Sequence, residues 1–365
     1  MNEYANRTIN LAFRAIPLSN LEKDFILSGY CEDSKQELVS IATKKKVLPV
    51  VGKMLVSLQI DTDFWTDKYN FFLQRNLKVT ELIAEVFRNF HENGIDRICA
   101  FENYGAMLAA DTDIALFSSG DVDLYADVLH KQEIEKVMAT LGYFPRIDDA
   151  HRRNISSEFL KENGIIRINI AWKPLRRYLL PISFDSARYF NWEEMKYYKD
   201  TYIKLPSPET LLYMCFLRIA VHGYSRSPDI RLYIDSFNAS RNNPNWEEVI
   251  KWAEIDRVKT KFLTVAVIAN DLINLSVPSF VLNAAKNDKY VQRILRETYD
   301  FESHSLIYDP TGIKLLKVEA ASDQRSVIKE ILCMLFPPRN WLCEYYQDKD
   351  SAWYKKYQNY YRRLF

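Results

Sequence analysis

The stretch that decides the fold is SSGDVDLY, residues 118–125. From Asp121 onward its polar and apolar residues alternate, which is the pattern of a half-buried β-strand. Side chains two residues apart on a strand point to the same face, and their Cα atoms are roughly 6.5 Å apart. We therefore expect Asp121 and Asp123 to share one open face, while Val122 and Leu124 enter a hydrophobic core.

Two carboxylates on one face are suited to one or two Mg²⁺ ions (or Mn²⁺), because these hard cations prefer oxygen ligands. Such ions can polarise a phosphate, hold a triphosphate and activate a hydroxyl for in-line attack. Asp121 and Asp123 are thus the candidate metal ligands. An Asp-x-Asp pair by itself is more often a solvated strand face, so the neighbouring sequence has to decide between the two interpretations.

Upstream, the pattern predicts a strand at 95–101 and then a loop, Asn103-Tyr104-Gly105-Ala106, that opens a short helix. Backbone N–H groups at a helix N-terminus bind phosphate. Gly120, directly before the first aspartate, permits close approach of a backbone or a ligand because it has no side chain. Both features favour the interpretation in terms of phosphate chemistry.

Downstream, a helix is predicted at 130–141, and Gly142 closes it. A hairpin follows, with strands at 156–160 and 165–172. Its turn contains Asn163-Gly164, and Asn-Gly is a strong signal for a hairpin turn. Strands and helices therefore interleave in this central part of the chain.

Helical patterns flank this centre. Residues 62–93 carry a long amphipathic pattern with Gly94 as the expected C-cap, and Pro49 is expected to break an earlier stripe. Ser207-Pro208 combines an N-cap with proline at the first helical position. The fold class is therefore α+β, a mixed-sheet core flanked by N-terminal helices and a C-terminal helical domain. The expected boundaries are 1–94 for the N-terminal helical region, 95–205 for the α/β core, 206–340 for the helical domain, and 341–365 for an aromatic and basic helical tail.

Composition and charge limit the classes of function. The 365 residues are 48% hydrophobic and 27% charged, as in soluble globular proteins, and the net charge of +1 argues against nucleic acid or anionic membrane as a partner. The most apolar stretch, 262–269, is far shorter than the roughly 18 residues of a membrane span, and the N-terminus lacks a signal-peptide pattern. A cytoplasmic protein is expected. Five scattered cysteines without a Cys-x-x-Cys pair indicate buried reduced thiols rather than a zinc site.

In combination, these features resemble the DNA polymerase β-type nucleotidyltransferase superfamily, and more narrowly the bacterial family called uncharacterised nucleotidyltransferases. The resemblance covers roughly residues 35–340. It implies a nucleotidyltransferase-type mixed-sheet core that transfers a nucleoside monophosphate from an NTP with Mg²⁺. It rests on segments that occur in the family's order: Tyr104-Gly105, Gly120–Leu124, Gly142-Tyr143, His151, Ala171-Trp172, His222-Gly223 and Asp235.

The chain departs from the family pattern at four positions that usually carry a charged or ionisable side chain. The superfamily places a third carboxylate on a later strand, where this chain has Asn169, and the family's histidine on that strand is Ala171. A basic residue before the aspartate pair is replaced by Phe117 or Ser118, and the lysine before the glycine by Tyr104. An asparagine can coordinate a metal through its carbonyl oxygen but cannot act as a general base. These departures leave open a degenerate copy that binds a nucleotide or a partner without turnover.

The residue pattern and the resemblance together define the expected site. An NTP is the expected donor, and the acceptor is an unidentified small molecule, sugar or peptide. His151 and Arg152 either contact the triphosphate or belong to a solvated charged loop. The catalytic candidates are Asp121, Asp123 and Asn169, and the nucleotide-binding candidates are Asn103, Tyr104, Gly105, Ser119, Gly120, His151 and Arg152.

Overall fold

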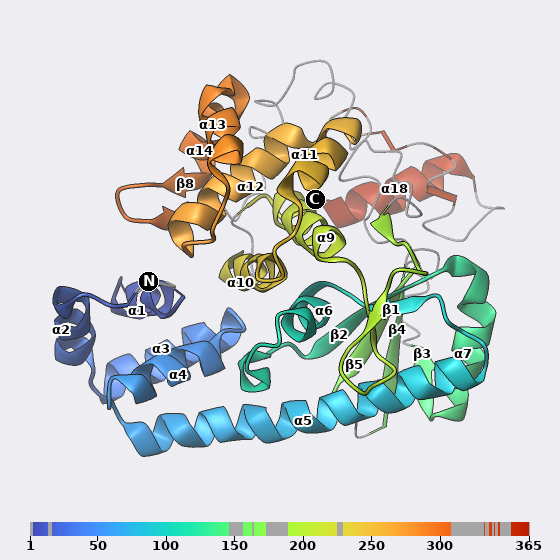
Figure 1. Cartoon of the computed structure of the whole chain (residues 1–365), viewed down its shortest axis with the longest axis horizontal. Coiled ribbons are helices and arrows are strands. Elements are labelled where there is room, and N and C mark those ends of the chain that lie inside the picture. Colours follow the sequence, from blue (N-terminus) through green and yellow to red (C-terminus); the bar gives the residue numbers. More distant parts are fainter. Residues whose placement is uncertain are drawn as a thin grey trace. The chain divides into compact units, whose positions relative to one another are not determined.

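The chain divides into two compact units, each built from segments that are distant in sequence. A computed structural model (Figure 1) describes residues 3–13, 17–145, 156–162, 164–172, 189–224, 229–307, 332, 336–337, 339, 342–343 and 352–364. The first unit, called the helical unit below, comprises Met1–Leu82, Glu102–Ser119 and Ser207–Ser322. The second, called the sheet unit, comprises Ile83–Phe101, Gly120–Pro206 and Asp323–Phe365.

The helical unit begins with four short helices and the start of one long helix. They are α1 (Glu3–Ala12), α2 (Asn20–Gly29), α3 (Glu32–Lys44), α4 (Leu48–Ser57) and α5 (Thr62–Glu92). The predicted helix at 62–93 is confirmed as α5, and Gly94 follows it with a positive φ of 72°. The break expected at Pro49 falls earlier, at residues 45–47. Pro49 instead lies in the first turn of α4, where its missing N–H leaves no hydrogen bond unmade.

These N-terminal helices share a core with a helix from much later in the chain. Ile9, Leu38, Leu55 and Trp65 are fully buried in one hydrophobic cluster, and Ile230 of α10 (Asp229–Ser240) belongs to the same cluster. Burial of each large side chain of this kind stabilises the fold by roughly 1.5–3 kcal/mol. The N-terminal helices therefore depend for their core on residues far along the sequence.

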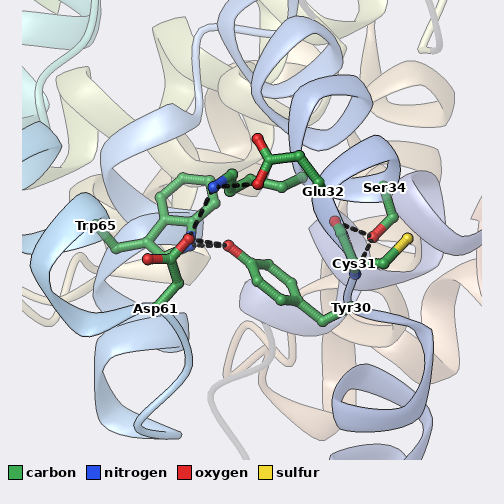
Figure 2. Close-up of polar contacts among 7 residues, drawn as sticks. Tyr30, Cys31, Glu32, Ser34, Asp61 and Trp65 are labelled. Carbon is green, nitrogen blue, oxygen red and sulfur yellow. Dashed lines mark hydrogen bonds and ion pairs between the residues drawn. The ribbon is translucent and has the colours of Figure 1, made fainter.

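A group of polar contacts joins the α2–α3 junction to the segment before α5 (Figure 2). The carboxylate of Asp61 accepts hydrogen bonds from Tyr30 Oη at 3.1 Å and from Lys35 Nζ at 3.0 Å. Lys35 also contacts Glu32 at 2.7 Å, and the indole N–H of Trp65 donates to Tyr30 Oη at 2.8 Å. We call these five residues the Tyr30–Asp61 cluster.

The rest of the described part of the helical unit is mostly α-helical. Ser207 caps α9 through a hydrogen bond to the N–H of Thr210, with Pro208 as the first helical residue, as predicted. Most of α9 is buried, because it packs against several neighbouring helices. Besides α10, the remaining elements are α6 (Glu102–Ala109), the 3₁₀ turn η1 (Ile114–Leu116), α9 (Pro208–Val221), α11 (Trp246–Ile255), α12 (Lys259–Leu272), α13 (Ser279–Asn287), α14 (Lys289–Thr298), and the short hairpin β8 (Tyr299–Asp300) and β9 (Ser305–Leu306).

The sheet unit is built around a five-stranded mixed sheet with the order β1-β2-β5-β4-β3. Only β2 and β5 are parallel neighbours, and the other three pairs are antiparallel. The strands are β1 (Ile98–Ala100), β2 (Asp121–Ala126), β3 (Tyr143–Pro145), β4 (Ser156–Lys161) and β5 (Arg167–Ala171). The other elements are η2 (Val128–His130), α7 (Lys131–Thr140), the pair β6 (Lys196–Tyr197) and β7 (Lys204–Leu205), and α18 (Trp353–Leu364).

The strand predicted from Asp121 onward is confirmed as β2, and the predicted hairpin is the antiparallel pair β4–β5. The loop expected at 103–106 is wrong, because α6 already begins at Glu102 and includes these residues. A side chain at Gly164 would place its Cβ 2.9 Å from the carbonyl oxygen of Lys161, so the turn needs a glycine there. With a mixed sheet and helices on both sides of it in sequence, the fold is α+β.

The cysteines only partly follow the prediction of buried thiols. Cys99 and Cys215 are buried, and burial raises the pKa of each thiol above its usual value because the thiolate loses its hydration. Cys31 is exposed and Cys343 is half-buried, so the prediction is wrong for Cys31; Cys333 lies outside the described residues.

Within the described ranges, no helix is both long enough and apolar enough to cross a membrane.

Candidate metal and nucleotide site

The parallel pairing of β2 and β5 brings three predicted site residues to one face of the sheet. Asp123 lies directly opposite Asn169, and Asp121 lies opposite Arg167. Val122 on the other face of β2 is fully buried, whereas Asp121 is half-buried and Asp123 is 5% exposed. The two aspartates therefore share a face because the strand's apolar residues hold its other face in the core.

Asn169 contacts the carboxylate of Asp123 directly. Its Nδ2 donates a hydrogen bond to Asp123 Oδ1 at 2.8 Å. A neutral amide stabilises the charged aspartate without offsetting its charge. To serve as a metal ligand beside Asp123, the side chain of Asn169 has to turn so that Oδ1 replaces Nδ2. Asn169 thus lies beside Asp123 with its amide nitrogen toward the carboxylate.

A carboxylate that the sequence analysis missed lies one strand further along the same face. Glu158 on β4 is the register partner of Asn169, and Arg167 Nη1 binds Glu158 Oε1 at 3.0 Å. At about 4.8 Å between neighbouring strands, Glu158 is two strands, or roughly 10 Å, from Asp123. The hairpin around Asn163-Gly164 predicted the strand, but only the register between strands reveals that Glu158 shares the face of Asp123.

The described residues contain no group of three His, Cys, Asp or Glu side chains placed to hold a metal ion together. The pair Asp121 and Asp123 nevertheless suits Mg²⁺, which often binds through one or two carboxylates and completes its octahedral shell with waters and substrate phosphates. The chemistry of the donors therefore fits a metal that arrives with, or is completed by, a phosphate ligand.

The predicted phosphate-binding loop is the N-terminus of α6, in the helical unit. Asn103 is 3% exposed; its Oδ1 accepts a hydrogen bond from the N–H of Tyr104, while its Nδ2 has no hydrogen-bond partner among the described residues. Tyr104 is fully buried, and its hydroxyl bonds Thr80 Oγ1 at 3.1 Å. Tyr104 therefore packs in the core, and the Asn103 Nδ2 is a buried donor at this helix end without a hydrogen-bond partner among the described residues. Gly105 is also buried.

The chain links this helix directly to the carboxylate strand. The N–H of Phe101 donates to the carbonyl of Asp123 at 2.9 Å, and Glu102, the next residue, begins α6 with a left-handed φ of 48°. This conformation is uncommon for a residue with a side chain, so the surrounding contacts have to hold it. An ion pair between Glu102 and Arg218 of α9 is one of those contacts.

The remaining predicted residues are placed as follows. Ser119 is 1% exposed, and Gly120 has room for a side chain, because a Cβ there would lie 3.7 Å from its nearest neighbour, Arg167 Nη2. His151 and Arg152 lie outside the described residues. Asp235 forms a buried ion pair with Arg231 at 3.3 Å, one turn away on α10.

Comparison with known proteins shows the family of the chain. The chain matches the model of a family described as uncharacterised nucleotidyltransferase over residues 32–274, which is two thirds of its length, and it belongs to that family. No curated protein and no solved structure matches the chain. The matched region contains Asp121, Asp123, Asn169 and the N-terminus of α6.

Proposed function

We propose that this protein transfers a nucleoside monophosphate from an NTP to an acceptor with the help of Mg²⁺, as expected for the DNA polymerase β-like superfamily. The observation that carries the proposal is the pair Asp121 and Asp123 on one face of β2, beside Asn169 on the parallel strand β5. The acceptor is a small molecule, a sugar or a peptide.

In this reaction the acceptor oxygen attacks the α-phosphorus, the bond to the β-phosphate breaks, and pyrophosphate leaves. The bound metal supplies positive charge to the phosphate oxygens. Asp121 and Asp123 would hold that metal while it is bound to the phosphates of the NTP. Asn169 cannot take the acceptor's proton, so a carboxylate or the solvent has to receive it.

A second candidate function is binding of a nucleotide without turnover. The observation in its favour is the hydrogen bond from Asn169 to Asp123, because a neutral amide occupies the position where the superfamily has a third carboxylate. With one anionic ligand fewer, a site of this kind binds metal more weakly.

Measurement of pyrophosphate release distinguishes the two functions. Each NTP is supplied with Mg²⁺ or Mn²⁺, with cell extract as the source of acceptors, to the wild type and to the double variant Asp121→Asn/Asp123→Asn. Asp111→Asn is the matched control, since Asp111 is an exposed member of the second Asp-x-Asp in the sequence.

The proposal requires that the wild type and Asp111→Asn release pyrophosphate and that the double variant does not. Equal release by the wild type and the double variant contradicts it. NTP binding by the wild type without any release supports the second function instead.

A further inference from the structure

We propose that Arg167 is a phosphate-binding residue beside Asp121 and Asp123, and that its guanidinium binds phosphate oxygens of a metal-bound polyphosphate such as an NTP. The inference deepens the proposed function and rests on the metal site proposed there, but not on turnover. It follows from three features of the sheet unit: the register of β2 and β5, the open end of their shared face, and the contacts that fix the guanidinium.

Arg167 lies on the same face of the sheet as the two aspartates. In the parallel pair β2–β5 it is the register partner of Asp121, and its N–H donates to the carbonyl of Gly120 at 3.2 Å. Neighbouring strands are about 4.8 Å apart, so the main chain of Arg167 is one strand spacing from that of Asp121. All three residues belong to the sheet unit. The sheet itself therefore fixes where the arginine side chain begins.

The face is open at the end of β2 where Arg167 lies and covered at the other end. The side chain of Arg167 is 43% exposed and Asp121 is half-buried. Further along β2, Asp123 and Tyr125 are buried, and the ring of Tyr125 stacks on that of Trp192 at a centroid distance of 5.6 Å. A ligand of the two aspartates thus has its access at the end that carries the arginine.

Two acceptors hold the guanidinium group along one edge. Arg167 Nη1 donates to Glu158 Oε1 at 3.0 Å, and Nε lies 3.5 Å from the carbonyl oxygen of Gly120. A guanidinium has five N–H donors, and these two contacts do not involve Nη2. Nη2 lies beside Gly120, because a Cβ added to that glycine would be 3.7 Å from it. The group is therefore oriented in advance, with Nη2 next to the residue that precedes Asp121.

The charge of this face favours a cation at that position once a polyphosphate binds. On β2, β4 and β5, all of which the structure describes, the face carries three carboxylates, Asp121, Asp123 and Glu158, and one cation, Arg167. A triphosphate adds several negative charges, of which one Mg²⁺ offsets only a part. A guanidinium keeps its charge at any working pH, and its paired N–H donors match the oxygens of a phosphate group.

A second ion pair in the sheet unit serves as a comparison. Arg97 Nη1 contacts Asp127 Oδ2 at 3.1 Å, with side chains 53% and 19% exposed, whereas the values for Arg167 and Glu158 are 3.0 Å, 43% and 14%. Asp127 follows the far end of β2, six residues or roughly 20 Å along the strand from Asp121. Arg97 thus matches Arg167 in contact and exposure but lies away from the proposed metal site.

The test measures how the full chain binds two kinds of ligand. Isothermal titration calorimetry gives the affinity for inorganic tripolyphosphate and for each NTP, both with Mg²⁺, and electron paramagnetic resonance gives the affinity for Mn²⁺ alone. Arg167→Gln removes the charge, and Arg167→Lys keeps the charge but loses the paired donors. Arg97→Gln is the matched control. The double variant Arg167→Gln/Glu158→Gln removes both charges of the pair, so that an unpaired Glu158 cannot repel the phosphates.

We expect the two kinds of ligand to respond to Arg167→Gln in opposite directions. Mn²⁺ alone should bind about threefold more tightly, because a positive charge near Asp121 is lost. Tripolyphosphate and NTP should bind about tenfold more weakly, because charge-assisted hydrogen bonds are lost, and the double variant should share this loss. Arg167→Lys should weaken polyphosphate binding about threefold. Arg97→Gln should leave both affinities within about twofold of the wild type.

The inference is overturned if Arg167→Gln and Arg97→Gln bind tripolyphosphate equally well, if the double variant recovers the wild-type affinity, or if the wild type binds neither tripolyphosphate nor NTP. Loss of Mn²⁺ and polyphosphate affinity together in Arg167→Gln also overturns it, because that result indicates a structural role in the sheet. If polyphosphate binding depends on Arg167 but no NTP yields pyrophosphate, the inference stands and the proposed transfer reaction fails. If the wild type releases pyrophosphate and Arg167→Gln keeps full affinity for NTP, the reverse holds.

Discussion

The carboxylate face of the sheet and the Tyr30–Asp61 cluster are both rich in polar side chains, but the groups that contact their carboxylates differ in charge. In the Tyr30–Asp61 cluster, Lys35 contacts the carboxylates of both Glu32 and Asp61. On β2, two carboxylates lie side by side, and Asp123 receives a neutral amide from Asn169.

This difference separates a polar group that serves the fold from one suited to a ligand. Opposite charges in contact stabilise a structure modestly, whereas like charges on the same face of a strand oppose folding unless something else offsets them. On the sheet face Arg167 lies opposite Asp121, and a bound metal ion would add further positive charge beside the two aspartates. The sheet face should therefore respond strongly to metal, and the Tyr30–Asp61 cluster should not.

The largest effects are expected from variants that remove carboxylates from one of the two groups, the sheet face or the Tyr30–Asp61 cluster. Asp121→Asn/Asp123→Asn should lower the rate of pyrophosphate release at least about a thousandfold, because the metal loses its carboxylates, with a change of under about 1 kcal/mol in unfolding free energy. Asp61→Asn should leave the rate of pyrophosphate release unchanged and lower the free energy of unfolding by about 1 kcal/mol. Urea unfolding and the release assay on all variants test this. A loss of turnover in Asp61→Asn would place the cluster in the site.

Asn169→Asp tests the role of charge on the sheet face, because it adds a negative charge there. It replaces the amide donor 2.8 Å from Asp123 Oδ1 with a second carboxylate. We expect the metal-free protein to lose about 1–2 kcal/mol of stability, and its affinity for Mn²⁺ to rise about tenfold or more. Thermal melts with and without Mg²⁺ and titration with Mn²⁺ measure both quantities.

Asn191→Asp, an exposed asparagine in the sheet unit, is the control for added charge. If Asn169→Asp and Asn191→Asp respond alike to metal, then Asn169 is not a ligand position.

A smaller effect is expected from Tyr30→Phe. The lost hydroxyl accepts from Trp65 and donates to Asp61, so stability should fall by about 1 kcal/mol with no change in the Mg²⁺ dependence of the melting temperature. Tyr354→Phe, at an exposed tyrosine, should have no effect on either quantity. A Tyr30→Phe protein that melts with a changed response to Mg²⁺ contradicts the assignment of this cluster to folding alone.

The smallest effect appears at alkaline pH. Burial, followed by weaker contributions that include the charge of Asp61, raises the pKa of Tyr30 from 10.0 to about 12. The folded state therefore holds this proton more tightly than the unfolded state, so its contribution to stability is complete below pH 10 and is lost as the pH rises from 10 through 12.

The stability difference between the wild type and Tyr30→Phe should accordingly narrow above pH 10 in urea titrations at pH 8, 10 and 11. A constant difference across this range would show that Tyr30 titrates equally in the folded and unfolded chains.

Local pattern was enough to predict the strand that carries the site. The alternation after Gly120 predicted β2 and the common face of Asp121 and Asp123, because side-chain direction on a strand depends only on its period of two. The helix at 62–93 was equally accessible, because its apolar stripe is long.

Contacts between distant segments could not be predicted in the same way. Glu158 joins the face of Asp123 only through the register of β4 on β5, and Lys46 meets Ser119 across more than 70 residues of chain. Tyr104 was read as part of a phosphate loop, and the structure shows that its side chain is buried beside Thr80. Each of these contacts depends on which distant elements pack together. Local sequence patterns do not show which elements these are.

The burial of Ile230 with Trp65 has a consequence for synthesis of the chain. The cluster that holds the N-terminal helices together includes a residue 165 positions after Trp65. At about 5–20 residues per second, the ribosome takes roughly 8–33 s to produce that interval. During this time the apolar faces of the first helices lack one of their partners, so they are a natural place for a chaperone to bind the growing chain.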